Sequence, residues 1–162
     1  MLVTTKHTVK NKGEQQLELT RYFPYKLSIL ERVVGQSIAQ LYLGRFNLNR
    51  QEWRVIAALG TQKSMSAKEL TAYTNLEKMQ VSRAISRLRK DEMLHQQEDS
   101  QDRRYSQLSL TEKGKATYRK IVPLALAREE FILSGLTEKE QAQLFTLMEK
   151  VHDKADELQQ WG

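Results

Sequence analysis

The middle of the chain constrains the fold most, because helix-start signals follow one another there at short intervals. Asn49 and Ser66 are each followed three residues later by a glutamate, the pattern of a capping box at a helix N-terminus. A further helix, with Thr74 or Asn75 as its cap, is expected over Glu77–Asp91. Short helices joined by brief, capped connections predict a helix-turn-helix unit.

The hydrophobic period changes after these helices. Gly60 is expected to end the first of them. Further along, the pattern predicts two short strands, Leu94–Gln97 and Tyr105–Leu110, which are joined by a polar tip. Together the two strands predict a hairpin. A hairpin that follows a helix-turn-helix is a wing, so residues 45–119 are predicted to form a winged helix-turn-helix lobe.

Long helices are predicted on both sides of this lobe. Pro24 opens the first and Gly44 is suited to its C-terminal cap. Pro123 is expected to kink a helix that runs from about Thr111 to Ser134, and Thr137 begins the last helix with another capping box. The first and last helices carry apolar stripes, which are Leu27, Leu30, Val34, Ile38 and Leu41, and Leu144, Leu147, Met148, Val151, Ala155 and Leu158.

These elements predict a mainly α fold with a small β-wing, in which a winged helix-turn-helix is flanked by N- and C-terminal dimerisation helices. Residues 1–20 are polar without a sustained period and are predicted to be a flexible arm. Residues 21–44 and 120–162 are assigned as dimerisation helices, because their stripes are too long for so small a lobe to cover. Packing of the two helices on each other within one chain is the alternative.

Charge gathers in the predicted lobe. The chain of 162 residues has a net charge of +6; residues 45–119 hold 15 basic and 9 acidic residues, and residues 120–162 have a net charge of −3. A basic centre is the electrostatic footprint of a phosphate contact, although a solvated basic surface would look the same.

Several function classes are excluded by composition. The absence of cysteine excludes disulfides, thiol redox sensing, thiolate metal sites and cysteine catalysis. The longest apolar run, Ile121–Ala127, is far too short to span a bilayer, and Met1–Lys12 contain no secretory h-region, so we expect a cytoplasmic protein. No constellation of catalytic, cofactor-binding or metal-ligating residues is evident, so we expect neither an enzyme nor a cofactor.

The helix over Glu77–Asp91 is the best candidate for a recognition helix. Val81, Ala84, Ile85 and Leu88 form one apolar face at i, i+3, i+4 and i+7, and the other face is polar and basic. Such a face suits the major groove, where Gln reads adenine and Arg reads guanine. The candidate DNA-contacting residues of the lobe are Ser66, Lys68, Lys78, Gln80, Ser82, Arg83, Arg87, Lys90, Asp102, Arg103 and Arg104.

Within this set, the N-terminal half of the helix is expected to face base edges, through Lys78, Gln80, Ser82 and Arg83. Arg87 and Lys90 are expected to contact phosphates. At the wing tip, arginine suits the narrow minor groove, and Asp102 can orient Arg104. An ordinary amphipathic helix and a surface salt bridge are the structural alternatives.

Two stretches resemble the MarR family of winged helix-turn-helix transcription regulators. They are Val81-Ser82-Arg83 with Leu88, and Asp99-Ser-Gln-Asp102-Arg103-Arg104 followed by Leu108-Ser-Leu110-Thr111-Glu-Lys-Gly114. The resemblance covers about residues 25–158. It implies an obligate homodimer with intertwined terminal helices that binds a palindromic operator in double-stranded DNA, usually as a repressor. It places the DNA-contacting Ser/Thr-Arg pair on Ser82 and Arg83, and the wing pair on Asp102 and Arg104.

Many members of that family release DNA when a small phenolic or anionic ligand binds, so a small aromatic or anionic effector is a possible partner. Tyr42, Trp53 and Arg54 are candidates for lining such a cleft, although aromatic residues on helices are more often core. Two other functions stay open. An architectural or effector-independent DNA-binding protein would share the fold and charge, and an adaptor would use the fold without DNA.

Overall fold

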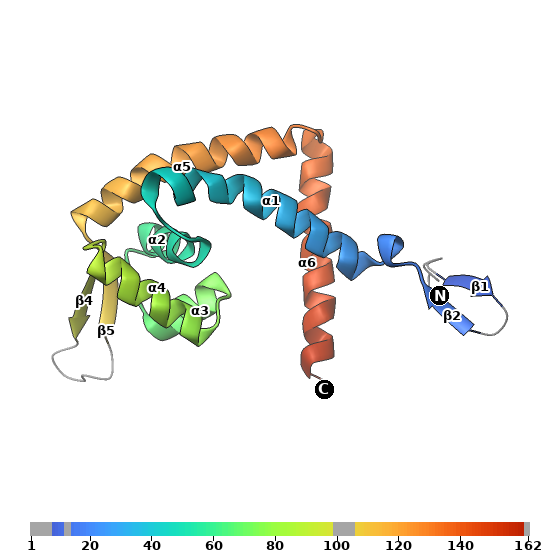
Figure 1. Cartoon of the computed structure of the whole chain (residues 1–162), viewed down its shortest axis with the longest axis horizontal. Coiled ribbons are helices and arrows are strands. Elements are labelled where there is room, and N and C mark those ends of the chain that lie inside the picture. The colour runs from blue at the N-terminus through green and yellow to red at the C-terminus, as the bar shows by residue number, and fades with distance from the viewer. Residues whose placement is uncertain (1–7, 12–13, 99–105, 161–162) are drawn as a thin grey trace. The chain divides into compact units, whose positions relative to one another are not determined.

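The computed structural model describes residues 8–11, 14–98 and 106–160, and the chain divides into two compact units, Met1–Ile121 and Val122–Gly162 (Figure 1). The first unit holds helices α1 to α4 and the described strands, and helix α5 continues from it into the second. The fold is mainly helical with a small antiparallel sheet, which confirms the predicted class. Within the described residues, no helix is long and apolar enough to cross a membrane.

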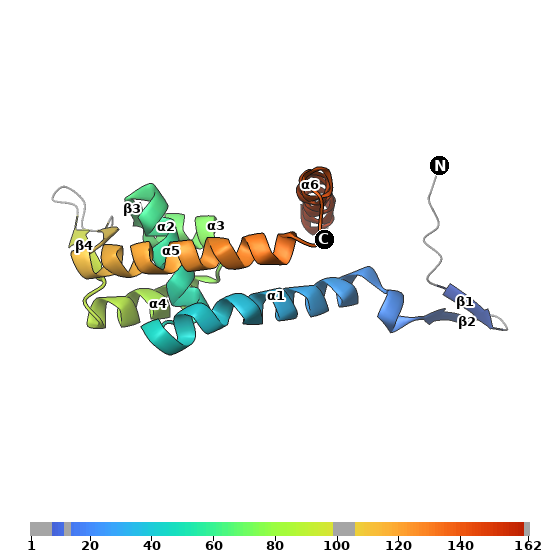
Figure 2. The same cartoon turned by 90° about the horizontal axis from the view of Figure 1, so that it is seen from above.

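Helix α1, Phe23–Phe46, is one uninterrupted helix in both views, with a proline in its first turn (Figures 1 and 2). It ends at Asn47, which adopts the left-handed conformation with φ 50°, so the prediction that Gly44 is the C-terminal cap is wrong. The Leu48 N–H donates to the Tyr42 carbonyl at 3.0 Å, and both side chains are buried. Packing at this corner therefore carries the helix past the glycine.

Helices α2, Arg50–Gln62, and α3, Ala67–Thr74, start where the sequence predicts. Both capping boxes are present: the Asn49 and Ser66 side chains each accept a hydrogen bond from the backbone N–H of the glutamate three residues later. These reciprocal bonds satisfy amide groups that have no partner within the helix. The caps thus fix the two turns that precede α2 and α3.

Helix α4, Lys78–Lys90, begins differently from the prediction. Its N-cap is Glu77, whose backbone N–H donates to Oε1 of Gln80 at 3.1 Å. Asn75 instead ends α3 in the left-handed conformation with φ 50°, and Thr74 is the last residue of that helix. Asparagine tolerates this conformation better than most residues, so it closes α3 and leaves the cap of α4 to Glu77.

Gly60 lies inside α2, which continues to Gln62, so the prediction that this glycine ends the helix is wrong. A Cβ atom at Gly60 would lie 2.5 Å from the ring of Tyr118, which comes from the start of α5, Glu112–Leu133. Glycine is needed here because the aromatic ring lies directly against the α2 backbone.

The sheet of the first unit has three strands in the order β3–β5–β4, where we predicted a hairpin of two. The strands are β3, Ser64–Ser66, β4, Leu94–Glu98, and β5, Ser106–Leu110. The unexpected strand β3 pairs antiparallel with β5, so that Met65 lies opposite Leu108, and both side chains are buried. This pairing ties the wing to the turn between α2 and α3.

The hydrophobic core takes residues from helices α1 to α4 and from the start of α5. The side chains exposed by at most 2% are Tyr42, Leu48, Val55, Ile56, Ala58, Leu59, Leu70, Val81, Leu88, Leu108 and Ile121. At its edge the Trp53 ring stacks between Tyr42 and Tyr118, with centroid distances of 6.0 and 6.3 Å. These contacts hold α1, α2 and the start of α5 in one arrangement.

The N-terminal segment, residues 1–20, which we predicted to be a flexible arm, contains a small hairpin among its described residues. Strands β1, Thr8–Asn11, and β2, Glu14–Leu17, pair antiparallel (Figure 2), and a short 3₁₀ helix, Leu19–Arg21, follows. The register of such polar strands is set by their backbone pairing and not by an alternation of apolar residues. Hydrophobic periodicity therefore did not predict them.

In the second unit, α5 continues through Pro123 and α6, Glu138–Gln160, follows. The predicted box at the start of α6 is present, because Glu140 accepts hydrogen bonds from both the N–H and the hydroxyl of Thr137 at 2.8 Å. Apolar side chains along α6 are exposed: Leu147 by 58%, Val151 by 44% and Leu158 by 75%. No described side chain of α6 is buried.

Candidate nucleic-acid interface

Helix α4 presents two very different faces. Its predicted apolar face is confirmed, since Val81, Ala84, Ile85 and Leu88 are all at most 9% exposed. Apart from Met79 and the half-buried Gln80, the remaining positions carry cations and hydroxyls, and these side chains are exposed. Burial of one face therefore fixes the rotation of the helix and directs its basic face outward.

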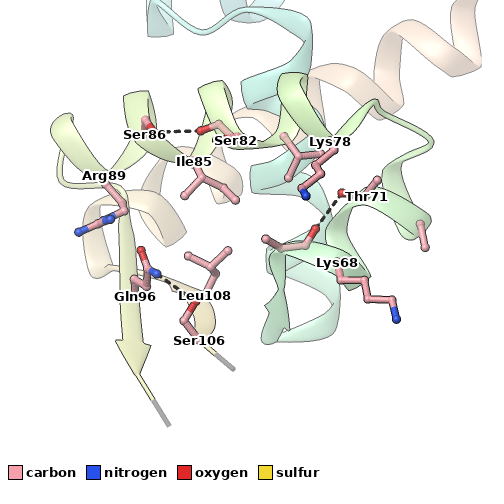
Figure 3. A pocket seen from close by; sticks show the side chains of 13 residues that line it. Lys68, Thr71, Lys78, Ser82, Ile85, Ser86, Arg89, Gln96, Ser106 and Leu108 are labelled. Carbon is pink, nitrogen blue, oxygen red and sulfur yellow. Dashed lines mark hydrogen bonds between the residues drawn. The ribbon is translucent and has the colours of Figure 1, made fainter. Parts of the chain in front are cut away.

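A groove of about 770 Å³ runs between α3, α4 and the sheet (Figure 3). Its floor is apolar and includes Ile85 and Leu108, which come from α4 and β5. Its described lining includes three cationic side chains, Lys68, Lys78 and Arg89, and no acidic one. A concave surface of this charge suits the phosphates of a nucleic-acid backbone.

Hydrogen bonds already orient the Ser86 hydroxyl and the Gln96 amide of the groove. The Ser86 hydroxyl donates to the Ser82 carbonyl at 3.0 Å, and Nε2 of Gln96 donates to the Ser106 hydroxyl at 2.9 Å (Figure 3). The second contact joins β4 to β5 across the sheet. These bonds hold the polar rim in place before any ligand binds, which lowers the entropy cost of binding.

The structure brings three predicted contact residues together in this groove: Lys68, Lys78 and Ser82. Arg83 and Lys90 are exposed elsewhere on α4. Arg87 pairs with Asp91, with 3.1 Å between Nε and Oδ2, so its charge is partly neutralised in the free protein. The three wing-tip predictions, Asp102, Arg103 and Arg104, lie outside the described residues.

Two predicted contact residues already have partners within the protein. The Ser66 hydroxyl donates to Glu69 at 2.8 Å and accepts from its N–H as the cap of α3. The Gln80 amide oxygen accepts from Glu77 in the cap of α4. A bidentate contact to adenine needs both amide atoms of glutamine. Gln80 would therefore have to leave the cap in order to read adenine.

Arg89 is the cationic groove residue that the sequence analysis missed. It lies on the same side of α4 as Lys78, Ser82 and Ser86, which follow one another at spacings of four, four and three residues. That spacing is a second, polar stripe beside the apolar one, and it is the signal that would have identified Arg89. Gln96 and Ser106 had no comparable signal, because their place depends on how the two strands pair.

The aromatic cluster at Tyr42 and Trp53 is more enclosed than an open ligand cleft. Tyr42 is 2% exposed, and burial raises the pKa of its hydroxyl, while nearby Arg50 opposes that rise. Arg50 also bonds Glu31 of α1. Nη1 of Arg54 donates to the carbonyl of Thr74 at 3.5 Å. These contacts give the candidate effector residues structural roles in joining α1, α2 and α3.

Among the described residues, no group of three or more His, Asp or Glu side chains could hold a metal ion. His152 lies 3.6 Å from Asp156 and 3.9 Å from Asp153 on α6, and all three side chains are well exposed.

The fold and sequence match known regulators. Residues 48–114 match the winged helix DNA-binding domain family. A helix-turn-helix-type transcriptional regulator of Bacillus cereus is 30% identical over 130 residues, which cover 78% of this chain and 86% of that protein. The structure of a MarR/EmrR family transcriptional regulator from Acinetobacter is 26% identical with a TM-score of 0.79, and the match covers 87% of this chain and 99% of the other. This chain belongs to the MarR family. It is a DNA-binding transcriptional regulator and not an enzyme.

Two further comparisons show how far the likeness extends. The regulator BilQ of Clostridium symbiosum is 31% identical over 93 residues, which are 57% of this chain and 65% of BilQ. The structure of BpsR from Bordetella bronchiseptica is 24% identical with a TM-score of 0.67 over 78% of this chain and 98% of BpsR. The BpsR likeness is one of fold. The DNA binding of BpsR is regulated by 6-hydroxynicotinic acid.

Proposed function

We propose that this regulator is a homodimeric repressor that binds a palindromic operator in double-stranded DNA and releases it when a small aromatic or anionic ligand binds. The observation that carries the proposal is the exposed basic face of α4 beside the cationic groove. Regulators of this kind bind the chromosome, so the protein would work in the cytoplasm.

Base reading is assigned to the outer face of α4, and phosphate contact to the groove. Arg83 is exposed and lies in the N-terminal half of α4, the part of a recognition helix that faces base edges. Lys68 and Lys78 lie on opposite walls of the groove, on α3 and α4. Positive charges on two walls of a concave surface suit a sugar-phosphate backbone that runs between the helices.

Exposed apolar side chains on the flanking helices support a homodimer. Leu27, Leu30 and Val33 of α1 are exposed by 47, 57 and 53%, and those on α6 are similarly accessible. Contiguous apolar surface of this kind marks an interaction site in a water-soluble protein. A twofold dimer would cover equivalent surfaces on both chains and place two α4 helices against two half-sites.

Relief by a ligand is supported by the fold-level likeness to BpsR, whose DNA binding is regulated by an aromatic acid. Ligands that bind only the folded state raise the unfolding temperature by mass action. A thermal-shift screen of aromatic carboxylic acids is therefore the direct test. An active ligand should raise the midpoint of unfolding and also release a bound operator duplex.

The central experiment selects duplexes from a random library and compares each with random duplex at one salt concentration. We expect a protected palindrome whose half-sites lie about one helical turn apart, with at least about a thousandfold preference over random DNA. Arg83→Ala should lower that preference at least about tenfold, because one good arginine–guanine contact discriminates by that much.

Lys120→Ala is the matched control, since it removes one exposed positive charge from α5, outside α4 and the groove. It should leave the preference unchanged. Equal affinity for selected and random duplex would contradict the proposal and favour the architectural alternative, in which charge and fold bind DNA without reading it.

A further inference from the structure

Met79, the second residue of α4, is an apolar side chain on the basic face of the helix. It is 60% exposed and does not belong to the hydrophobic core cluster. The apolar side of α4 is formed by residues at other positions, all of them buried. Folding therefore removes little of the Met79 side chain from water, and its apolar surface is available to a bound partner.

The geometry of the helix places Met79 next to Arg83. Residues four apart on a helix lie one above the other on the same face, and Arg83 is also exposed. Neither residue lines the groove between α3, α4 and the sheet. The pair thus lies on the outer face of α4, away from the side on which Lys78 and Ser82 face the groove.

The other early positions of α4 are less suited to reading bases from that face. Gln80 is half-buried, and its amide oxygen accepts from Glu77 in the cap. Lys78 faces the groove, as Figure 3 shows. Of the first three residues of α4, Met79 is the one whose side chain is exposed, outside the groove and outside the cap.

The chemistry of a thioether chain limits what it can recognise. Methionine has no strong hydrogen-bond donor or acceptor, but it is flexible and polarizable and fits irregular apolar surfaces. In the major groove the one apolar group on a base edge is the C5-methyl of thymine. An exposed methionine beside an arginine thus suits a thymine methyl close to a guanine.

We propose that Met79 is a specificity-determining residue that contacts the C5-methyl of one thymine in each half-site. Four helical residues rise about 6 Å and base pairs stack about 3.4 Å apart, so this thymine lies within about two base pairs of the base that Arg83 contacts. The inference rests on the proposed function, because it requires a preferred duplex sequence.

The experiment is a double-mutant cycle between protein and DNA. The probe is the duplex that the full chain selects from a random library, with each thymine replaced in turn by deoxyuridine, which lacks only the C5-methyl. For the natural protein, replacement of the contacted thymine in one half-site should weaken binding about three- to fivefold, the effect expected for one buried methyl group. Met79→Ala should bind the thymine and deoxyuridine duplexes equally.

Two further variants separate this contact from general effects. Met79→Leu keeps an apolar side chain of similar volume and should keep part of the thymine preference. Lys78→Ala should weaken binding to both duplexes by the same factor, because a phosphate contact carries no base information. Met79→Ala should leave the midpoint of thermal unfolding unchanged, since the residue is exposed.

The outcomes distinguish this inference from the proposed function. If a preferred duplex exists but Met79→Ala keeps the full sensitivity to every thymine, the assignment of Met79 is overturned and the proposed function stands. If no thymine methyl in the duplex affects binding, the assignment is likewise overturned. Absence of any preferred duplex would overturn both.

Discussion

Helices α4 and α6 carry apolar stripes of similar pattern, but the two stripes end up in opposite environments. In α4 the four stripe residues are at most 9% exposed, because α2, α3 and the sheet cover them. In α6 the residues Leu147, Val151 and Leu158 are 44 to 75% exposed in the single chain. Periodicity predicts that a helix face will be buried, but not whether the covering surface lies in the same chain.

The largest expected difference between the two regions is the response to core truncation. Leu88→Ala, at a side chain that is 0% exposed, should lower the free energy of unfolding by about 2–5 kcal/mol. Leu147→Ala, at a side chain that is 58% exposed, should leave the unfolding of a monomer nearly unchanged but weaken self-association. Urea unfolding at several protein concentrations and sedimentation would measure both. An equal loss of unfolding free energy in both variants, independent of protein concentration, would contradict the distinction between the two helices.

A smaller effect is expected from alanine substitution at two helix glycines, one packed against a side chain and one open to solvent. Gly60→Ala should lower the free energy of unfolding by about 1–3 kcal/mol, because the new Cβ would meet the Tyr118 ring at 2.5 Å. At Gly44 the new Cβ would meet no atom from outside its own stretch of helix within 4 Å, so Gly44→Ala should raise the free energy of unfolding by about 0.5–1 kcal/mol through the higher helix propensity of alanine. Thermal unfolding of both variants checks the opposite signs, and destabilisation by Gly44→Ala would show that α1 is packed at that point.

Helix caps test whether the two regions unfold together. Ser66→Ala and Thr137→Ala each remove a capping hydroxyl, and each should cost about 1 kcal/mol in its own region. Hydrogen exchange should show faster opening of α3 in the first variant and of α6 in the second. Equal acceleration of both helices by either variant would mean that the units open as one.

The smallest effect concerns pH. Hydrogen bonds from the backbone and hydroxyl of Ser66 lower the pKa of Glu69, and those of Thr137 do the same for Glu140. A carboxyl with a lowered pKa stabilises the fold above its ordinary value near 4.5, and this stabilisation is lost as pH falls through the lower, folded-state pKa. Glu69→Gln and Glu140→Gln should each reduce the fall in the free energy of unfolding at acid pH. Measurement of that free energy between about pH 6 and 2 would detect the change.

Local signals predicted much of the first unit. The caps at Asn49 and Ser66 depend on residues three apart, so the sequence alone places the starts of α2 and α3. The buried face of α4 follows in the same way from its period. The MarR family was predicted from the recognition helix together with the wing signature, and the comparisons confirm it.

Features that depend on distant contacts were missed. Strand β3 is only three residues long and exists because β5 pairs with it, so no local pattern marks it. Gly60 was read as a helix end because its real constraint, the Tyr118 ring, comes from another helix. The capping contact of Gln80 was missed for a related reason, since the cap of α4 depended on where α3 stopped.

The pairing of β3 with β5 has a consequence for how the chain is made. Met65 and Leu108 meet across about 40 intervening residues, so the sheet cannot close until the second of them has left the ribosome. Until then α3 and α4 lack the strands that complete the groove. Non-local pairing of this kind slows folding, so the groove is completed late in synthesis, after the helices that form its walls.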